Sequence, residues 1–162
     1  MNTTRGIRNN NPLNIRHSSN RWQGMTEKQT DPSFVQFRSM AYGYRAACKV
    51  LQTYYQRFRT EGKPFTVRTI ISRWAPPEDG NDTENYIRSV LLLGGLGGNE
   101  HLLPPDNPDG YPRLERLLIA MTCMECGTGI NQIEKKNIRE GFLKAFPRTL
   151  TMTESHRINR FG

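Results

Sequence analysis

Residues 113–129 read RLERLLIAMTCMECGTG, an apolar segment that carries an acidic residue, Glu125, near its end. The apolar residues recur at the spacing of one helix face, and they are Leu114, Leu117, Leu118, Met121 and Met124. This spacing predicts a helix. Pro112 suits the first turn of such a helix, and Gly127 suits the position just after the last turn. We therefore expect a buried helix that ends next to Glu125.

The position of Glu125 bears on its chemistry. The negative end of a helix dipole disfavours a carboxylate, and partial burial among Met and Cys side chains does the same. Both effects raise the pKa of a glutamate, which a general acid working near neutral pH requires. The alternative is an ordinary, solvent-facing glutamate at a frayed helix end.

A glycosidase usually needs a second carboxylate or a positioned water as well. Glu27 and Asp31 lie in a turn between two short alternating segments and are the candidates, although acidic residues are common in turns. A second cluster of acidic residues is better explained by a loop and the start of a helix than by a catalytic site: Glu78, Asp79, Asp82 and Glu84.

The rest of the chain is also mainly helical by its apolar periodicity. Helices are expected over 41–59, from Thr66 to Pro76, from Asp82 or Thr83 to the glycine cluster at 94–98, and over 131–146. Alternation over 21–26 and 33–39 predicts one small peripheral β-hairpin. With 162 residues, we expect one mainly α (α+β) domain over 1–146 and a basic tail over 147–162.

Composition limits the partners. The formal net charge of +8 indicates an anionic partner, which could be nucleic acid, an acidic membrane surface or an anionic cell wall. The arginines are scattered and form no known nucleic-acid-binding motif, so nucleic acid is the least favoured. No apolar run approaches the roughly 20 residues of a membrane span. The N-terminus also lacks the apolar stretch of a signal peptide, so synthesis in the host cytoplasm is expected.

The three cysteines are Cys48, Cys123 and Cys126. The pair Cys123 and Cys126 ends a helical pattern, whereas a redox C-x-x-C follows a strand, and no second pair is spaced to complete a zinc site. We expect reduced, buried thiols and no metal or cofactor.

The N-terminal run RGIRNNNPLNIR, residues 5–16, is rich in residues that favour turns. Asn9, Asn10, Asn11 and Asn14 could hydrogen-bond a sugar acetamido group, or simply satisfy the backbone of the turn. Aromatic side chains could line a sugar cleft, and the candidates are Trp22, Trp74, Tyr42, Tyr44 and Tyr86. Core packing is the better explanation for Trp74.

Several stretches together resemble a known group of proteins. RGIRNNNPLNIR, RWQG (21–24), FVQFRSMAYGYRA (34–46) and IISRWAPPEDGNDTENYI (70–87) are similar to short phage and prophage proteins labelled structural protein P5, which are thought to be lysozyme-like. The similarity covers about residues 5–145. It implies a lysozyme-like fold and a role on the bacterial cell wall.

A looser resemblance concerns the autolysin-type N-acetylglucosaminidases. In that family a catalytic helix ending in Glu-Ser-Gly precedes an asparagine turn, a hairpin and a segment with a tyrosine. NNNPLNI resembles the turn, and Tyr86 stands where that tyrosine would be. Only eight residues precede Asn9, so the glutamate helix is missing there. Glu125-Cys126-Gly127 resembles its end, which implies a circularly permuted domain with the catalytic helix late in the chain.

The sequence thus predicts a phage or prophage enzyme that cleaves peptidoglycan glycan strands, as a muramidase, a glucosaminidase or a lytic transglycosylase. Glu125 would be its general acid, assisted by Glu27 or Asp31, with Asn9, Asn10, Asn11, Asn14, Trp22 and Tyr86 binding substrate. It would act as an endolysin after release, or from the virion with other virion proteins. The alternative is a non-catalytic virion structural or assembly protein with a lysozyme-like fold.

Overall fold

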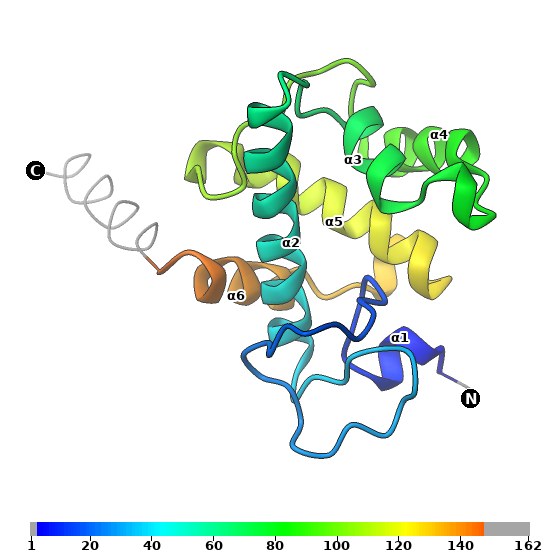
Figure 1. Cartoon of the computed structure of the whole chain (residues 1–162), viewed down its shortest axis with the longest axis vertical. Coiled ribbons are helices and arrows are strands. Elements are labelled where there is room, and N and C mark those ends of the chain that lie inside the picture. Colours follow the sequence, from blue (N-terminus) through cyan, green and yellow to red (C-terminus); the bar gives the residue numbers. More distant parts are fainter. Residues whose placement is uncertain (1–2, 148–162) are drawn as a thin grey trace, which may run out of the picture.

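The computed structural model describes residues 3–147 (Figure 1). The α-helices are α1 (Arg5–Arg8), α2 (Met40–Thr60), α3 (Val67–Trp74), α4 (Thr83–Gly94), α5 (Tyr111–Cys126) and α6 (Lys135–Ala145). Three short 3-10 helices connect them: η1 (Pro77–Asp79), η2 (Pro108–Gly110) and η3 (Ile130–Gln132). The mainly helical, single-core architecture expected from the sequence is confirmed. The expected basic tail, apart from Pro147, lies outside the described residues.

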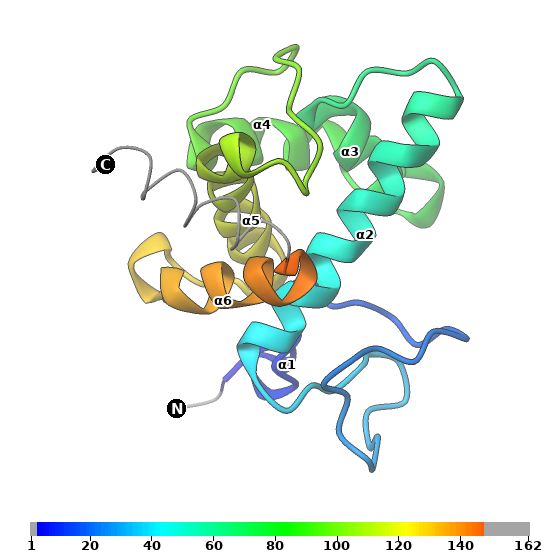
Figure 2. The same ribbon diagram turned by 90° about the vertical axis from the view of Figure 1, so that its left-hand side faces the viewer.

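The helices divide the molecule into two ends joined by α2 and α5. Figures 1 and 2 both show α3 and α4 at one end, and α1 with the long loop over 9–39 at the other. Helix α6 packs across α2, while α5 packs on α4 and its last turn reaches α1. The core lies between these helices and includes Tyr44, Leu51, Ile70, Leu118, Met121 and Ile138. No helix within residues 3–147 is long and apolar enough to cross a membrane.

Local signals explain where the helices begin and end. The Ser39 side chain caps α2, Thr66 and Thr69 form a reciprocal capping box at α3, and Asp82 accepts a hydrogen bond from the Asn85 N–H at α4. Gly127 follows α5 with a φ of 64°, in the left-handed region where glycine is favoured. The helix boundaries predicted from Thr66, Asp82 and Gly127 are therefore confirmed.

The predicted hairpin is reduced to isolated contacts. Segments 21–26 and 33–39 run antiparallel, but the described residues hold only two single bridges, Arg16 with Phe34 and Met25 with Phe37. Between the segments, the Gln36 N–H donates to Gln29 Oε1, and Gln29 Nε2 donates back to the Gln36 carbonyl. Backbone bonds from the Thr26 N–H to the Gln36 carbonyl and from the Arg38 N–H to the Gly24 carbonyl also link the segments, but they do not form the regular ladder that alternation predicted.

Two other boundaries differ from the prediction. Residues 5–8 form one helical turn, where only turn structure was expected. The last helix begins at Lys135, four residues later than predicted, because the Gly129 N–H donates to Gln132 Oε1 and closes the separate turn η3. Ile133 and Glu134 are then extended before α6 starts.

Close contact between α2 and α6 depends on Gly141. A Cβ at this position would lie 2.6 Å from the Cβ of Tyr44 and 2.7 Å from the carbonyl oxygen of Ala41. One of these atoms is backbone, so it cannot move aside cheaply.

We expect Gly141→Ala to lower the free energy of unfolding by about 1–3 kcal/mol, the usual cost of overpacking a core. Gly129→Ala is the control, because its new Cβ would meet nothing nearer than 3.9 Å and φ is −81°. Urea unfolding followed by circular dichroism measures both. Equal stability of the two variants would contradict the assigned α2–α6 packing.

Candidate functional site

Glu125 lies in the last turn of α5 and is half-buried. Burial raises the pKa of its carboxyl group above the ordinary value, while hydrogen bonding from Tyr86 and Trp74 acts in the opposite direction. Because the shift is upward on balance, Glu125 holds its proton to a higher pH than an exposed glutamate does. The structure thus agrees with the raised pKa expected from the sequence.

Tyr86 is the neighbour that orients this carboxyl group. Its hydroxyl donates a hydrogen bond of 3.0 Å to Glu125 Oε2. The ring is buried in the packing of α4 against α5. Burial, followed by the proximity of Glu125, raises the pKa of Tyr86 far above its usual range, so the hydroxyl keeps its proton as a donor. Tyr86 therefore contacts the candidate acid, whereas the sequence assigned it to substrate.

The N-terminal turn packs directly against the end of α5. Asn14 Nδ2 donates to the backbone carbonyl of Glu125 at 3.1 Å. The thiol of Cys126 donates to the Pro12 carbonyl at 3.3 Å. Gly6 permits the contact, since a Cβ there would lie 2.7 Å from Cys126 Sγ. The two segments that the sequence comparison brought together, more than a hundred residues apart, are thus neighbours.

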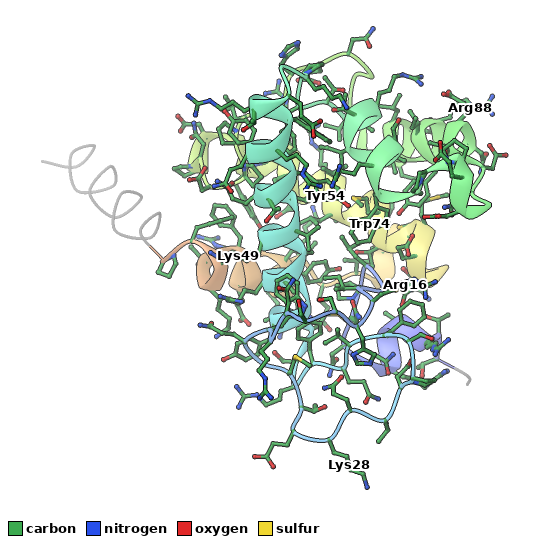
Figure 3. All side chains as sticks on the ribbon, viewed as in Figure 1. Arg16, Lys28, Lys49, Tyr54, Trp74 and Arg88 are labelled. Atoms are coloured by element: carbon green, nitrogen blue, oxygen red, sulfur yellow. The ribbon has the colours of Figure 1, made fainter. Side chains whose placement is uncertain are left out.

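Glu125 faces a cleft of about 360 Å³ between the two ends of the molecule. Its lining residues come from the N-terminal loop, α2, the α3–α4 connection and α5: Asn14, Ile15, Arg16, Phe34, Val50, Tyr54, Trp74, Ala75, Asp79, Asn81 and Glu125. Figure 3 shows Arg16, Trp74 and Tyr54 around this region. Trp74 is half-buried and both packs on the core and lines the cleft. The cleft combines aromatic faces, amides and an acid, as sugar recognition requires.

Arg16 brings a positive charge to the cleft. Its guanidinium stacks on the Phe34 ring at 5.0 Å, and Arg5 stacks on the same ring at 4.5 Å. The charge of Arg16 lowers the pKa of Glu125 slightly against the larger effect of burial. This cation can attract an anionic substrate, while the pKa of Glu125 still lies above its ordinary value.

The other asparagines hold the loop together. Asn11 is fully buried, donates to the carbonyls of Ile15 and Val35, and accepts from the Ile15 N–H. Asn9 donates to Asp31, and Asn10, with a φ of 51°, donates to the Phe37 carbonyl. None of these three lines the cleft. The structure thus favours the backbone-satisfying alternative for Asn10 and Asn11, whereas the Asn9 side chain hydrogen-bonds the side chains of Asp31 and Gln36. Asn14 is left as the candidate substrate ligand.

The two acids predicted to assist Glu125 lie elsewhere. Asp31 forms a two-pronged ion pair with Arg5, both contacts at 2.6 Å, and accepts from the backbone N–H groups of Ser33 and Phe34. The Arg5 guanidinium holds the pKa of Asp31 far below its usual range. Glu27 is exposed, and neither residue lines the cleft. The prediction that one of them works beside Glu125 is not supported, because Asp31 is engaged in structure.

Asp79, by contrast, lines the cleft, although its position in an acidic loop indicated only a structural role. Trp22 does not line the cleft; it is half-buried against the core. Tyr44 is buried, and its hydroxyl lies 2.9 Å from that of Thr122. No sequence pattern distinguished Asp79 from its acidic neighbours; only the path of the loop after α3 does so.

The described residues contain no cluster of three or more His, Cys, Asp or Glu side chains that could hold a metal ion. Cys48 and Cys126 are buried, Cys123 is half-buried, and all three are free thiols. Burial raises the pKa of the Cys126 thiol to about 11 and that of Cys48 to about 12. Both therefore stay protonated near neutral pH, as inert core thiols do.

Comparison with known proteins identifies a relative. The chain is 39% identical over 141 residues to Protein P5 of Pseudoalteromonas phage PM2, and the match covers 85% of this chain and 79% of that protein. No protein-family model matches the chain. The predicted similarity to phage P5 proteins is confirmed, while the lysozyme-like fold and the similarity to autolysins stay predictions.

The Asp31–Arg5 pair yields a pH-dependent prediction. Because the folded-state pKa of Asp31 lies below the unfolded value of about 3.9, its stabilising effect is present above that pH and is lost on acidification. We expect Asp31→Asn to melt several degrees lower than wild type at pH 7, and the gap to narrow below about pH 4.

Glu27→Gln is the matched control, since Glu27 is exposed and makes no ion pair or hydrogen bond within residues 3–147. Thermal melts followed by circular dichroism across the acid range provide the measurement. The structural role of Asp31 would be contradicted if the difference in melting temperature between wild type and Asp31→Asn widened on acidification. An equal drop in melting temperature in Glu27→Gln would contradict it as well.

Proposed function

The chain belongs to the family of the phage protein P5, and we propose that it cleaves the glycan strands of peptidoglycan. One observation carries this proposal: a half-buried glutamate with a raised pKa, Glu125, lines an open cleft and accepts a hydrogen bond from Tyr86. A protonated carboxylic acid at the edge of an aromatic and amide-lined cleft is the central group of a glycosidase.

In this reaction the carboxyl O–H of Glu125 donates its proton to the glycosidic oxygen. The bond from C1 to that oxygen breaks, the departing sugar leaves as an alcohol, and positive charge develops at C1. A water, or a hydroxyl group of the same sugar, then attacks C1. The Glu125 carboxylate takes the proton from this nucleophile and is ready for the next cycle.

The assisting carboxylate differs from the one expected from the sequence. Asp31 is engaged by Arg5, and Glu27 lies outside the cleft, so Asp79 is the carboxylate available to stabilise the positive charge. Asp79 is exposed, and water screens it strongly. We therefore infer that Glu125 performs both proton transfers, and that Asp79 assists electrostatically. Attack by the sugar's own hydroxyl, the lytic transglycosylase outcome, needs no further carboxylate.

The late position of Glu125 in the chain fits a circularly permuted lysozyme-like domain. The end of α5 contacts α1 and the turn at Pro12–Asn14, which is the neighbour that a catalytic helix at the start of the chain would have. A permuted order is compatible with the same packing, because chain termini often lie close together.

The first test is clearing of outer-membrane-stripped bacterial cells by wild type and by Glu125→Gln. We expect the variant to lose about 10²–10⁴-fold of the rate, since glutamine cannot donate the proton. It should stay folded, because its amide oxygen still accepts from Tyr86. Asp79→Asn, the matched loss of a carboxylate on the other wall, should cost less than about tenfold.

The outcomes separate the alternatives. A comparable loss in Asp79→Asn would make Asp79 a second catalytic carboxylate. Equal clearing by wild type and Glu125→Gln would remove Glu125 as the acid. No clearing by folded wild type on several cell walls would favour a non-catalytic virion structural or assembly protein.

The pH profile tests the contact with Tyr86. Its hydrogen bond favours the ionised form of Glu125 and so lowers the pKa of that acid. Because the protonated form is active, Tyr86→Phe should move the alkaline limb of the clearing profile to higher pH. Tyr42→Phe, on α2 and outside the cleft, should leave the limb in place. A shift to lower pH in Tyr86→Phe would contradict the proposed role of the hydroxyl.

A further inference from the structure

A second hollow, of about 660 Å³, lies beside the cleft that holds Glu125. Both are lined by Tyr54 of α2, so the two hollows adjoin at this residue. Helix α3 contributes to both: Trp74 lines the cleft, and Arg68, Ser72 and Arg73 line the second hollow. Figure 3 shows Tyr54 and Trp74 near each other between α2 and α3. The hollow is therefore the neighbouring surface that a polymer extending beyond the cleft on this side would meet.

The second hollow is basic. Lys63, Arg68 and Arg73 line it, and none of the described residues along its wall is acidic. Lys63 pairs with Glu61 at 3.1 Å and Arg68 with Glu84 at 2.7 Å, but both pairs are largely exposed. Exposed pairs of this kind are weak because water and salt screen them. Both cations can therefore share a second anion that enters the hollow.

Arg73 is held at the junction. Its guanidinium lies over the Tyr54 ring at 5.3 Å, a distance typical of a cation–π contact. Burial raises the pKa of Tyr54 to about 12, so the ring keeps its neutral hydroxyl. A guanidinium fixed on an aromatic face loses little further freedom when it binds, and its fork matches carboxylate or phosphate oxygens.

We propose that this basic hollow is a binding site for the acidic groups, carboxylate or phosphate, that the wall polymer carries next to the sugars in the cleft. The inference rests on the proposed function, which supplies the polymer. Contacts away from the bond being cut would hold the strand in register with Glu125, so that binding energy is used for orientation.

The test is binding of a non-cleaving variant to insoluble cell walls, measured by sedimentation. In the Glu125→Gln background, we expect Lys63→Gln with Arg73→Gln to weaken binding about tenfold at low salt. The control is Lys28→Gln with Arg88→Gln, which removes the same charge from exposed positions away from Tyr54 (Figure 3). The control should bind nearly as the background does, and high salt should abolish the difference.

Binding to two kinds of treated cell wall identifies the source of the acidic groups. If stem-peptide carboxylates are bound, removing the peptides enzymatically should erase the difference in binding between the two double variants. If phosphates are bound, stripping phosphate-bearing polymers should erase it. Equal binding by both double variants, equal weakening by both, or a difference that survives both treatments would overturn the basic site.

Parallel clearing assays with wild type keep the two proposals apart. If wild type clears cells normally but the two double variants bind walls equally, only the basic site is removed. If Lys63→Gln with Arg73→Gln alone loses binding and wild type does not clear cells, the wall-binding site is kept and the enzymatic activity is removed. Absence of binding by the background variant itself would contradict the site.

Discussion

The contact between the N-terminal turn and the end of α5 is the constraint on which the site depends. Asn14 binds the carbonyl of Glu125, and the Cys126 thiol binds the carbonyl of Pro12. Gly6 is needed because a Cβ there would lie 2.7 Å from Cys126 Sγ and 3.0 Å from the Asn11 carbonyl oxygen. This contact closes one wall of the cleft and keeps Glu125 partly out of water.

The two acids Glu125 and Asp31 act on stability in opposite directions. The pKa of Glu125 is raised in the fold, so its ionised form is disfavoured there, and stability is lost as the pH rises through that pKa. Asp31 has a lowered pKa and stabilises the fold above its unfolded value. The loop that Asp31 holds also carries Asn14 and Arg16, so one acid supports the fold in which the other stays protonated.

Periodicity and capping residues were sufficient to predict α2 to α5, because Thr66, Asp82 and Gly127 act through neighbours in the sequence. They predicted neither α1 nor the start of α6. The direction of the pKa shift of Glu125 was also predictable, because its apolar neighbours in the sequence indicated partial burial, which is the main cause in the fold. The roles of Asn11 and Asp31 were not predictable, since Asn11 donates to the Val35 carbonyl and Asp31 pairs with Arg5. Each of these partners lies more than twenty residues away, and apolar periodicity carries no information on such contacts.

The central claim is that the fold keeps Glu125 protonated at a higher pH than free glutamate. Its most direct test is a ¹³C NMR titration of the side-chain carboxyl groups, with the Glu125 signal assigned by its loss in Glu125→Gln. We predict a midpoint clearly above the unperturbed value of about 4.3. A midpoint at or below that value would mean that the cleft favours the carboxylate, and Glu125 could not be the acid.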